Sequence, residues 1–354
     1  MKILVINPGS TSTKFAVSDG KEQLFSKTIR HTKEELDRFE TIPDQKYFRF
    51  DNIKDALAES GLSLDDIDAV ASRGGIVKPI ESGTYDINEA LVADLKGPRA
   101  GLHASCLAGL IGYELKQQYH IPAFIVDPVV VDELADVARL TGIPNVERVS
   151  IFHALNQKAI SRECAHDMNK EYEECNFVVA HMGGGISVAA HQKGRVVDVN
   201  NAIGGDGPFS PERSGTVASL TIAELIANET FSKDDIKKLA TGKGGLTAYL
   251  GTNDLREVER MIDDKDDYAM LIFEGMAYQI AKEIGAMAAV LKGEIDAIIL
   301  TGGLAYSKRF TEIITEYVRF AAPVKLYPGE FEMEALASAV LRVLKGEEES
   351  KVYI

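Results

Sequence analysis

The sequence has 354 residues, about twice the size of a usual domain, so two domains with separate cores are expected. Its 45% hydrophobic and 26% charged residues are typical of an ordinary globular protein. The formal charge of −15 would repel a nucleic-acid backbone or an acidic membrane surface, so neither is expected as a partner. Any anionic ligand must therefore be held by a local cluster of positive groups.

Cysteine spacing and hydropathy both predict a cytoplasmic protein. Cys106, Cys164 and Cys175 have neither CxxC spacing nor an even count, which argues against a disulfide framework or a zinc site. No apolar run approaches the roughly 18 residues of a membrane span. The first residues, MKILVIN, enter a strand directly, without the pattern of a signal peptide.

The first patterned segment is repeated in the second half of the chain. Residues 3–17 (ILVINPGSTSTKFAV) have an apolar strand, a loop of small residues and a second apolar strand, and residues 177–190 (FVVAHMGGGISVAA) have the same order. Each copy is followed by a turn with glycine, at Gly20 and Gly194, and by another strand candidate. The pattern predicts a three-stranded antiparallel meander that occurs twice.

A second repeat follows each meander. Residues 67–75 (IDAVASRGG) and 295–303 (IDAIILTGG) both give an apolar strand that ends in a glycine pair after a helical run. A strand followed by two glycines is common in α/β proteins, so one such match would mean little. Two matches in the same order predict a duplicated α/β unit, with a ligand site in the cleft between the copies.

The remaining elements are predicted from hydrophobic spacing. Residues 53–60, 107–118 and 152–168 have helical spacing, and residues 123–131 form a strand broken by Asp127 and Pro128. Residues 253–292 are predicted to be mostly helical, with Asn253 and Asp254 as caps and Gly293 as the stop. The last helix should begin near residue 331, and the tail EEESKVYI should be a frayed end. We expect domains at 1–149 and 150–334, with a C-terminal helix at about 335–354 that packs back on the first.

The loop of the first meander superficially suggests a P-loop, because Gly9 precedes Lys14 by five residues. The Walker pattern fails, since it requires a glycine before the lysine and a hydroxyl residue after it. The remaining pattern is a β-turn at Pro8 and Gly9, followed by four hydroxyl residues beside backbone N–H groups. A hydrophilic hairpin tip is the simpler interpretation, but such a nest of donors favours a phosphate site.

The second and third loops support a ligand of the same kind. In residues 181–187 (HMGGGIS), three glycines let the backbone approach a ligand closely, and His181 can donate a hydrogen bond toward developing charge. Residues 301–305 (TGGLA) end a strand and precede a helix. By itself, that third segment is more typical of a plain strand-to-helix turn.

These motifs carry a family resemblance. NPGSTSTK, HMGGGIS and TGGLA resemble the first phosphate loop, second phosphate loop and adenosine loop of the superfamily that contains acetate and sugar kinases, heat-shock chaperones and actin. More narrowly, VINPGSTSTK, VDPVVVDE, SIFHALNQK, VAHMGGGIS and DGPFSPERSG are similar to the short-chain fatty-acid kinases of the butyrate kinase type. The resemblance covers nearly the whole chain and implies two actin-like (ribonuclease H-like) α/β domains.

The resemblance implies an ATP-dependent, reversible phosphoryl transfer to a carboxylate, a Mg²⁺ cofactor and a homo-oligomer, either a dimer or a multiple of dimers. It assigns nucleotide and phosphate binding to Asn7, Ser10, Ser12, Lys14, Gly183, Gly184, Gly185, Gly302, Gly303 and Leu304. It assigns active-site roles to Arg73, Arg213, His181, Asp127, His153 and His103. It assigns the metal to Asn7 and Glu332, with Glu330 and Glu334 as adjacent candidates.

The chemistry explains these residue types. A carboxylate has a pKa of roughly 4 to 5, so it is already a nucleophile at pH 7 and needs no general base. The obstacle is repulsion between two anions, which fixed positive groups such as Arg73 and Arg213 would offset. Each residue also has a simpler interpretation: a surface ion pair for either arginine, packing for His103 and His153, and a turn for Asp127.

The acyl pocket is predicted from a departure from the longer acetate kinases. They place a valine two positions after the first arginine, whereas this chain has Gly75, which would leave room for a longer acyl chain beside Leu102 and Phe152. Butyrate is therefore the expected substrate, and isobutyrate, propionate and valerate remain alternatives. An actin-like nucleotide switch without a small acceptor and a kinase for a sugar or polyol are the rival functions.

Overall fold

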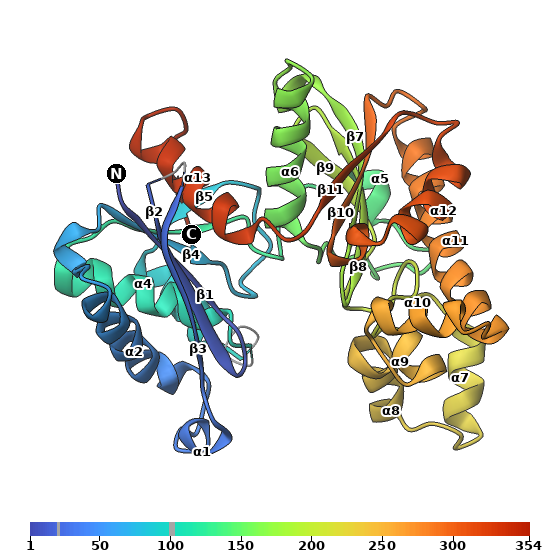
Figure 1. The fold of residues 1–354 in the computed structure, drawn as a ribbon, viewed down its shortest axis with the longest axis horizontal. Helices are drawn as coiled ribbons and strands as arrows, with labels where there is room; N and C mark the ends of the chain where they lie inside the picture. The colour runs from blue at the N-terminus through green and yellow to red at the C-terminus, as the bar shows by residue number, and fades with distance from the viewer. Residues whose placement is uncertain (20–21, 99–102) are drawn as a thin grey trace. The chain divides into compact units, whose positions relative to one another are not determined.

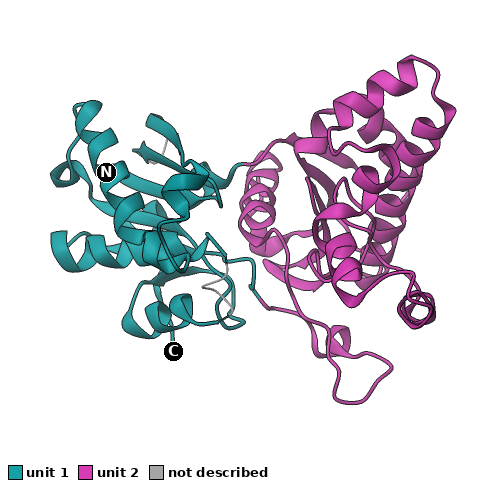
Figure 2. Cartoon of the chain, turned by 90° about the horizontal axis from the view of Figure 1, so that it is seen from below, with its two compact units in different colours: residues 1–131, 331–354 teal, residues 132–330 magenta. Residues whose placement is uncertain are grey.

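The computed structural model describes residues 1–19, 22–98 and 103–354. The chain forms two compact units, each with its own sheet and core. Unit 1 contains residues 1–131 and 331–354, and unit 2 contains residues 132–330 (Figure 2). The glycine turn predicted at Gly20 lies outside the described residues.

Unit 1 is built on a seven-stranded sheet in the order β12-β5-β6-β4-β1-β2-β3 (Figure 1). The first three strands form an antiparallel meander, and β4 and β6 continue the sheet parallel to β1. The strands are β1 (Ile3–Pro8), β2 (Ser12–Ser18), β3 (Gln23–Arg30), β4 (Ala69–Arg73), β5 (Thr84–Asp86), β6 (Ala123–Val126) and β12 (Lys351–Val352).

Helices cover both faces of this sheet, which explains why β1 is apolar at successive positions. Leu4 and Ile6 belong to the core that includes residues of α2 and α4, whereas Val5 lies beside Met333 of α13. The helices of unit 1 are α1 (Lys33–Leu36), α2 (Lys46–Glu59), α3 (Glu89–Lys96), α4 (Cys106–Tyr119) and α13 (Glu332–Leu344).

Unit 2 has a five-stranded sheet in the order β11-β10-β7-β8-β9. The first three strands of this sheet in chain order, β7, β8 and β9, form another antiparallel meander. Strand β10 lies parallel to β7, as β4 lies parallel to β1. The strands are β7 (Asn176–Met182), β8 (Ile186–Gln192), β9 (Arg195–Val199), β10 (Ala297–Gly302) and β11 (Val324–Pro328). The duplicated α/β pattern that the sequence predicts is therefore confirmed.

Alternate residues of β7 face different helices. Val178, Ala180 and Met182 pack into the core that α11 helps to form, and His181 is bonded instead to Asn156 of α6. The helices of unit 2 are α5 (Asp136–Arg139), α6 (Ala154–Asp167), α7 (Ser219–Ala227), α8 (Lys233–Lys238), α9 (Gly245–Leu250), α10 (Leu255–Asp263), α11 (Asp267–Val290) and α12 (Lys308–Val318).

The predicted helix over residues 253–292 is two helices. Asp254 caps α10 as expected, because its carboxylate accepts the Arg256 N–H, and Gly293 follows the end of α11 with φ 77°. The chain breaks between them, where Lys265 has φ 71° and the Asp266 carboxylate caps α11. This second capping aspartate was not predicted from the sequence.

The prediction of a frayed C-terminus is wrong. Residues Lys351–Val352 form β12, which pairs in parallel with β5, and the Tyr353 side chain is only 2% exposed. Its hydroxyl lies 2.5 Å from Asp94 Oδ2 and accepts the Lys78 N–H at 3.1 Å. Apolar residues at the end of a charged tail were the signal for this contact.

The units divide the chain at other places than the sequence suggested. Residues 132–149 belong to unit 2, because the Ala135 N–H donates to the Val197 carbonyl and Arg148 pairs with Asp198 at 2.7 Å. At the other end, α13 packs on β1 and β4 of unit 1. None of the described helices is long and apolar enough to cross a membrane.

Candidate functional site

In unit 1, the structure brings together Asn7, Arg73 and Glu332. Asn7 and Arg73 lie near the carboxyl ends of the adjacent parallel strands β1 and β4, and Glu332 begins α13. Arg73 Nη1 donates to Asn7 Oδ1 at 3.1 Å, Arg73 Nη2 lies 3.2 Å from Glu332 Oε1, and Asn7 Nδ2 donates to Glu332 Oε2 at 2.7 Å. These contacts hold the guanidinium in one orientation.

Of the three candidate glutamates, Glu332 is the one that contacts Arg73 and Asn7. Glu334 lines a cavity beside β2, and Glu330 belongs to unit 2. Within the described residues, no group of three acidic, histidine or cysteine side chains could hold a metal by itself. Mg²⁺ is often bound by one or two carboxylates together with substrate phosphates, so Glu332 and the Asn7 amide oxygen are a donor set of a suitable kind.

The first loop is a tight hairpin turn, as predicted, and a buried arginine holds it. The Gly9 N–H donates to the Ser12 carbonyl at 2.8 Å. Arg49, which is fully buried in α2, donates to the carbonyls of Gly9, Ser10 and Ser12 at 2.7 to 2.9 Å. Ser10 and Lys14 are exposed, and Ser12 is half-buried.

The hydrogen bonds of Arg49 use all five of its N–H groups. Its remaining donors reach Gln45 Oε1 at 2.8 and 3.1 Å. Neither an ion pair nor a hydrogen bond joins Arg49 to a carboxylate among the described residues, and burial lowers its pKa to about 10. A positive charge is therefore fixed directly behind the loop that was predicted to bind phosphate.

Asp127 and His103 also belong to unit 1, and each has its own partners. Asp127 has φ 35°, and its Oδ1 accepts the Ser82 hydroxyl at 2.7 Å and the Gly83 N–H at 2.8 Å. His103 Nδ1 accepts the Ser105 N–H at 3.2 Å. Desolvation and the positive charge of Arg73 lower the pKa of His103, which places it within electrostatic reach of that arginine.

In unit 2, His153 and His181 stack on each other. Their ring centroids are 4.0 Å apart and the rings are 17° from parallel. His181 Nδ1 is bonded to Asn156 Oδ1 at 2.7 Å, and His153 Nδ1 to the Ser187 hydroxyl at 2.8 Å. An ideal Cβ on Gly183 would lie 3.5 Å from His181 Nε2, so this nitrogen is next to the glycine loop.

The glycines of that loop are packed against Glu212 and Arg213. A Cβ on Gly184 would lie 3.0 Å from the Glu212 carboxylate, and one on Gly185 would lie 1.9 Å from Arg213 Nη1. Arg213 Nη1 donates to the Ala202 carbonyl, and burial lowers the pKa of Arg213. Its Nε is buried and has no hydrogen-bond partner among the described residues.

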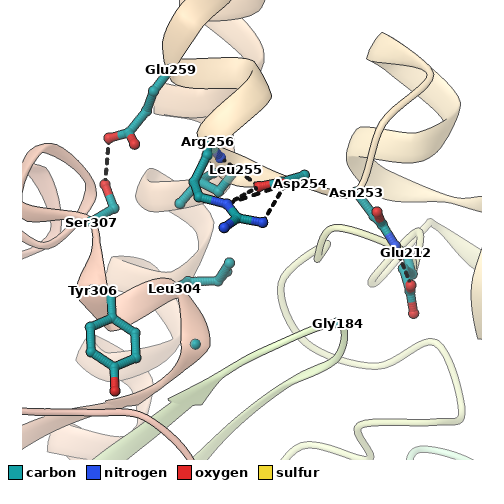
Figure 3. Close-up of a pocket in the computed structure, with 11 residues that line it drawn as sticks. Gly184, Glu212, Asn253, Asp254, Leu255, Arg256, Glu259, Leu304, Tyr306 and Ser307 are labelled. Atoms are coloured by element: carbon teal, nitrogen blue, oxygen red, sulfur yellow. Dashed lines mark hydrogen bonds and ion pairs between the residues drawn. The ribbon is translucent and has the colours of Figure 1, made fainter.

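A cavity of about 710 Å³ in unit 2 joins the second loop to the third (Figure 3). Ligand pockets usually measure about 300 to 1,000 Å³. Gly184 is on one side and Leu304 is on the other, and Gly303 also lines the cavity. The remaining lining residues are Glu212, Asn253, Asp254, Leu255, Arg256, Glu259, Tyr306 and Ser307.

Polar contacts organise the wall of this cavity. Arg256 pairs with Asp254 at 2.7 Å, the Ser307 hydroxyl donates to Glu259 at 2.7 Å, and Asn253 Nδ2 donates to Glu212 at 2.7 Å (Figure 3). The third loop enters through Gly302, whose φ is 89° and where a Cβ would lie 2.4 Å from the Met182 carbonyl oxygen. Only glycine fits that position.

The expected role of Gly75 needs revision. A Cβ on Gly75 would lie 2.6 Å from Leu95 Cδ2 and 3.3 Å from Cys106 Cα, so packed protein atoms fill the space beside it. Phe152 is buried in unit 2. Leu102 lies outside the described residues. The missing side chain at Gly75 is thus explained by core packing and gives no separate sign of a longer acyl pocket.

Sequence reasoning missed Arg49, Asn156 and most residues of the cavity wall. Asn156 follows His153 by three positions, a helical spacing that could have placed it on the same face. Nothing in the sequence around Arg49 distinguishes it from an exposed helix residue. The cavity wall combines α10 with the segment after β10, which are some 40 residues apart in the chain.

Known proteins resemble this chain in part of its sequence and in its fold. Residues 145–312 match the model of the acetokinase family. Among solved structures, the chain resembles the acetate kinase of Porphyromonas gingivalis (TM-score 0.80, 21% identity, covering 97% of this chain and 99% of that one). It also resembles a propionate kinase from Francisella tularensis (TM-score 0.78, 20% identity, 96% and 98% coverage) and the acetate kinase of Entamoeba histolytica (TM-score 0.78, 17% identity, 98% and 99% coverage).

The matched segment contains His153, His181, the glycine loop and Arg213, and Arg73 precedes it. At about 20% identity, the solved structures establish the fold and leave the substrate open. Through residues 145–312 the chain matches the acetokinase family, and over nearly its whole length it has the fold of the acetate and propionate kinases.

Proposed function

We propose that this protein is an ATP-dependent kinase that phosphorylates the carboxylate of a short-chain fatty acid. The proposed reaction is butyrate + ATP = butanoyl phosphate + ADP, reversible and by direct in-line transfer. One carboxylate oxygen forms a bond to the γ-phosphorus while the bond from that phosphorus to the bridging oxygen of ADP breaks. The proton count does not change, because the carboxylate is ionised at pH 7.

The observation that carries the proposal is the cavity shared by Gly184, Gly303 and Leu304. It provides space for a nucleoside next to a loop whose backbone can approach phosphates closely. The same loop adjoins His181 Nε2 and the guanidinium of Arg213, which are the kinds of group that stabilise a transferring phosphoryl group.

The acceptor is assigned to Arg73. Its planar guanidinium can bind a carboxylate with two parallel hydrogen bonds, and Asn7 and Glu332 keep it oriented. Arg213 and His181 would stabilise the charge on the equatorial oxygens. His153 and His103 would support this arrangement, and Asp127 would position neighbouring groups. Phosphate binding falls to Ser10, Ser12 and Lys14 of the first loop and to Gly183 and Gly185 of the second.

Glu332 and Asn7 would hold Mg²⁺ through their oxygen atoms, together with phosphate oxygens of the nucleotide. The ion would neutralise charge on those phosphates when bound. Because Arg73 shares both residues, cation and arginine would be held by the same side chains.

Butyrate is proposed as the preferred substrate because the motifs resemble kinases of the butyrate type, and the packing of Gly75 adds no support. Isobutyrate, propionate and valerate remain alternatives. An actin-like nucleotide switch would have no use for a held arginine such as Arg73. A sugar or polyol kinase would need a carboxylate as base for a hydroxyl, and Asp127 already accepts two hydrogen bonds on Oδ1.

The test is a panel of carboxylates from C2 to C5 with ATP, Mg²⁺ and hydroxylamine, which converts any acyl phosphate to a hydroxamate. Hydroxamate formation that is highest with butyrate is the expected result. ADP release without hydroxamate for every acid would overturn the kinase assignment and favour the switch. A maximum with another acid would keep the reaction and change only the substrate.

A further inference from the structure

A buried hydrogen-bond chain leads from the interior of unit 2 to His153. Its members are Tyr172, His191, Gln157 and Ser187, each of which is at most 2% exposed. Gln157 is on α6, and His191 and Ser187 are on β8. None of these four residues has been given a role in the proposed reaction. The chemistry of the partner atoms fixes which atom donates in each of these bonds.

Gln157 fixes the direction of the chain. Its Nε2 lies 2.9 Å from the Ser187 carbonyl oxygen, which can only accept, so the amide cannot be turned around without losing this bond. The same Nε2 donates its second hydrogen to Ser187 Oγ at 2.8 Å. The Gln157 Oε1 atom must therefore accept, and it faces His191 Nε2 at 2.9 Å.

His191 must consequently carry its proton on Nε2. Its Nδ1 then accepts the Tyr172 hydroxyl at 2.7 Å. Ser161 lies 3.2 Å from the same nitrogen, but its hydroxyl hydrogen has a shorter bond, at 2.7 Å, to the Gln157 carbonyl. Burial and the charges of Lys158 and Arg162 hold the pKa of His191 well below its usual value, which agrees with a neutral ring.

The Ser187 hydroxyl continues the hydrogen-bond chain by donating to His153. The Ser187 hydroxyl already accepts from Gln157 Nε2 and weakly, at 3.4 Å, from the His153 backbone N–H. Its own hydrogen has one acceptor among its described contacts, His153 Nδ1 at 2.8 Å. If His153 Nδ1 donated instead, a fully buried hydroxyl hydrogen would lose that acceptor, which is an unfavourable arrangement.

We infer that Gln157 and Ser187 are positioning residues that fix neutral His153 in the tautomer with its proton on Nε2. The Nδ1 nitrogen accepts from Ser187, so Nε2 is the hydrogen-bond donor of the ring. The ring stacks on His181, whose Nε2 lies beside the glycine loop. Since phosphoryl oxygens only accept hydrogen bonds, this tautomer is the one that can stabilise them. That consequence rests on the proposed function, whereas the tautomer itself does not.

The test is nitrogen NMR of the full-length protein with ¹⁵N-labelled histidine, in which the two ring nitrogens of each tautomer have distinct shifts. The His153 signal is assigned by its loss in His153→Gln. We expect Nε2 of His153 to carry the proton. A His153 ring with the proton on Nδ1 would overturn the inference.

Two variants test whether Gln157 and Ser187 fix the tautomer of His153. Gln157→Glu removes the donor to Ser187 and offers that hydroxyl an acceptor, so Ser187 can accept from His153 Nδ1–H and the tautomer should switch. Ser187→Ala removes the link with little change in volume, so one tautomer should no longer be fixed, and it serves if Gln157→Glu fails to fold. Tyr172→Phe is the matched control, because it deletes a bond of the same network but leaves Gln157 to orient His191.

The outcomes test the tautomer of His153 separately from the proposed kinase activity. An unchanged His153 signal in both Gln157→Glu and Ser187→Ala would contradict the assigned roles, whatever the activity. If the tautomer switches as expected and the protein is a carboxylate kinase, kcat should fall by about 10²-fold, the effect of removing one oriented donor. A tautomer that switches in the variant, together with a wild-type protein that phosphorylates no carboxylate, would leave the positioning role intact and reject the proposed function.

Discussion

The guanidinium of Arg213 occupies the space that a side chain on Gly185 would need. A Cβ there would lie 1.9 Å from Nη1 and 2.4 Å from Cζ, closer than any tolerated contact. The third glycine of the second loop is thus required by the position of Arg213. This contact couples the loop to the arginine and can be tested without a substrate.

We expect Gly185→Ala to lower the free energy of unfolding by about 1 to 3 kcal/mol, the usual cost of overpacking. In an Arg213→Ala background the same change should cost much less, because the colliding group is gone. Gly183→Ala is the matched control, since its Cβ would make an ordinary contact at 3.5 Å. Urea unfolding of the four proteins of this cycle measures the coupling. Equal costs in both backgrounds would show that Arg213 does not occupy this position.

Arg49 should matter more for the first loop than any residue of the loop itself. Arg49→Met removes donors from three backbone carbonyls and should cost at least about 3 kcal/mol of unfolding free energy. Arg49→Lys should recover only part, because three donors replace five in a fork. The loop amides should also exchange faster with deuterium in the lysine variant. Arg38→Met, at an exposed position of unit 1, is the control, and a similar loss there would argue against a specific role.

The sequence was sufficient to predict the duplicated sheet pattern, because buried parallel strands give continuous apolar runs that end at fixed loops. It also placed Asn7 and Arg73 at the ends of strands, whereas the pairing of those two strands and the contact between the two side chains come from the structure. These are local signals. The partners of such residues depend on register and on helices far away in the chain, as with Glu332, which is 325 positions from Asn7.

Other features were not predicted, because a residue that looks exposed or unpacked in the sequence can be buried in the fold. Arg49 looks like a surface residue in sequence and is fully buried. Gly75 looks like an opening and is packed against Leu95. Tyr353 looks like part of a charged tail and anchors a strand. Arg49 and Gly75 are explained by buried neighbours that the sequence pattern does not reveal, whereas the apolar residues at the end of the tail were a signal for Tyr353.

The packing of Gly75 predicts how a substitution there will behave. Gly75→Ala should destabilise unit 1 and lower activity toward acetate, propionate and butyrate by the same factor, because its Cβ collides with Leu95 and not with a substrate. Leu95→Ala should partly restore stability in the double variant. Kinetics on the three acids together with thermal unfolding check this. A selective loss with butyrate would return Gly75 to the acyl pocket.

The C-terminal residues should stabilise unit 1 unequally. Removing Ile354 alone should have almost no effect, because it is 94% exposed. Removing Tyr353 as well deletes a buried ring and its contacts with Asp94 and Lys78, which should cost about 3 to 5 kcal/mol. Tyr353→Phe should cost less, since the ring is kept. Urea unfolding of the three proteins gives the comparison, and equal stability of the two truncations would mean that the tail is not anchored.

Buried His191 makes the stability of unit 2 depend on pH. Its pKa in the folded protein is well below the usual histidine value of about 6.5, so the unfolded chain binds the proton more tightly. The stabilisation is fully present above about pH 6.5 and is lost as the pH falls toward the folded pKa, by at most about 1.4 kcal/mol per pH unit for one proton.

His191→Gln can still donate to Gln157 and accept from Tyr172, but it does not titrate. The difference in unfolding free energy between wild type and His191→Gln should therefore become less favourable to wild type between about pH 7 and pH 5. Lowered pKa values of His31 and His103 act in the same direction in both proteins and cancel in this difference. A difference that does not change with pH would show that His191 is protonated equally in the folded and unfolded states.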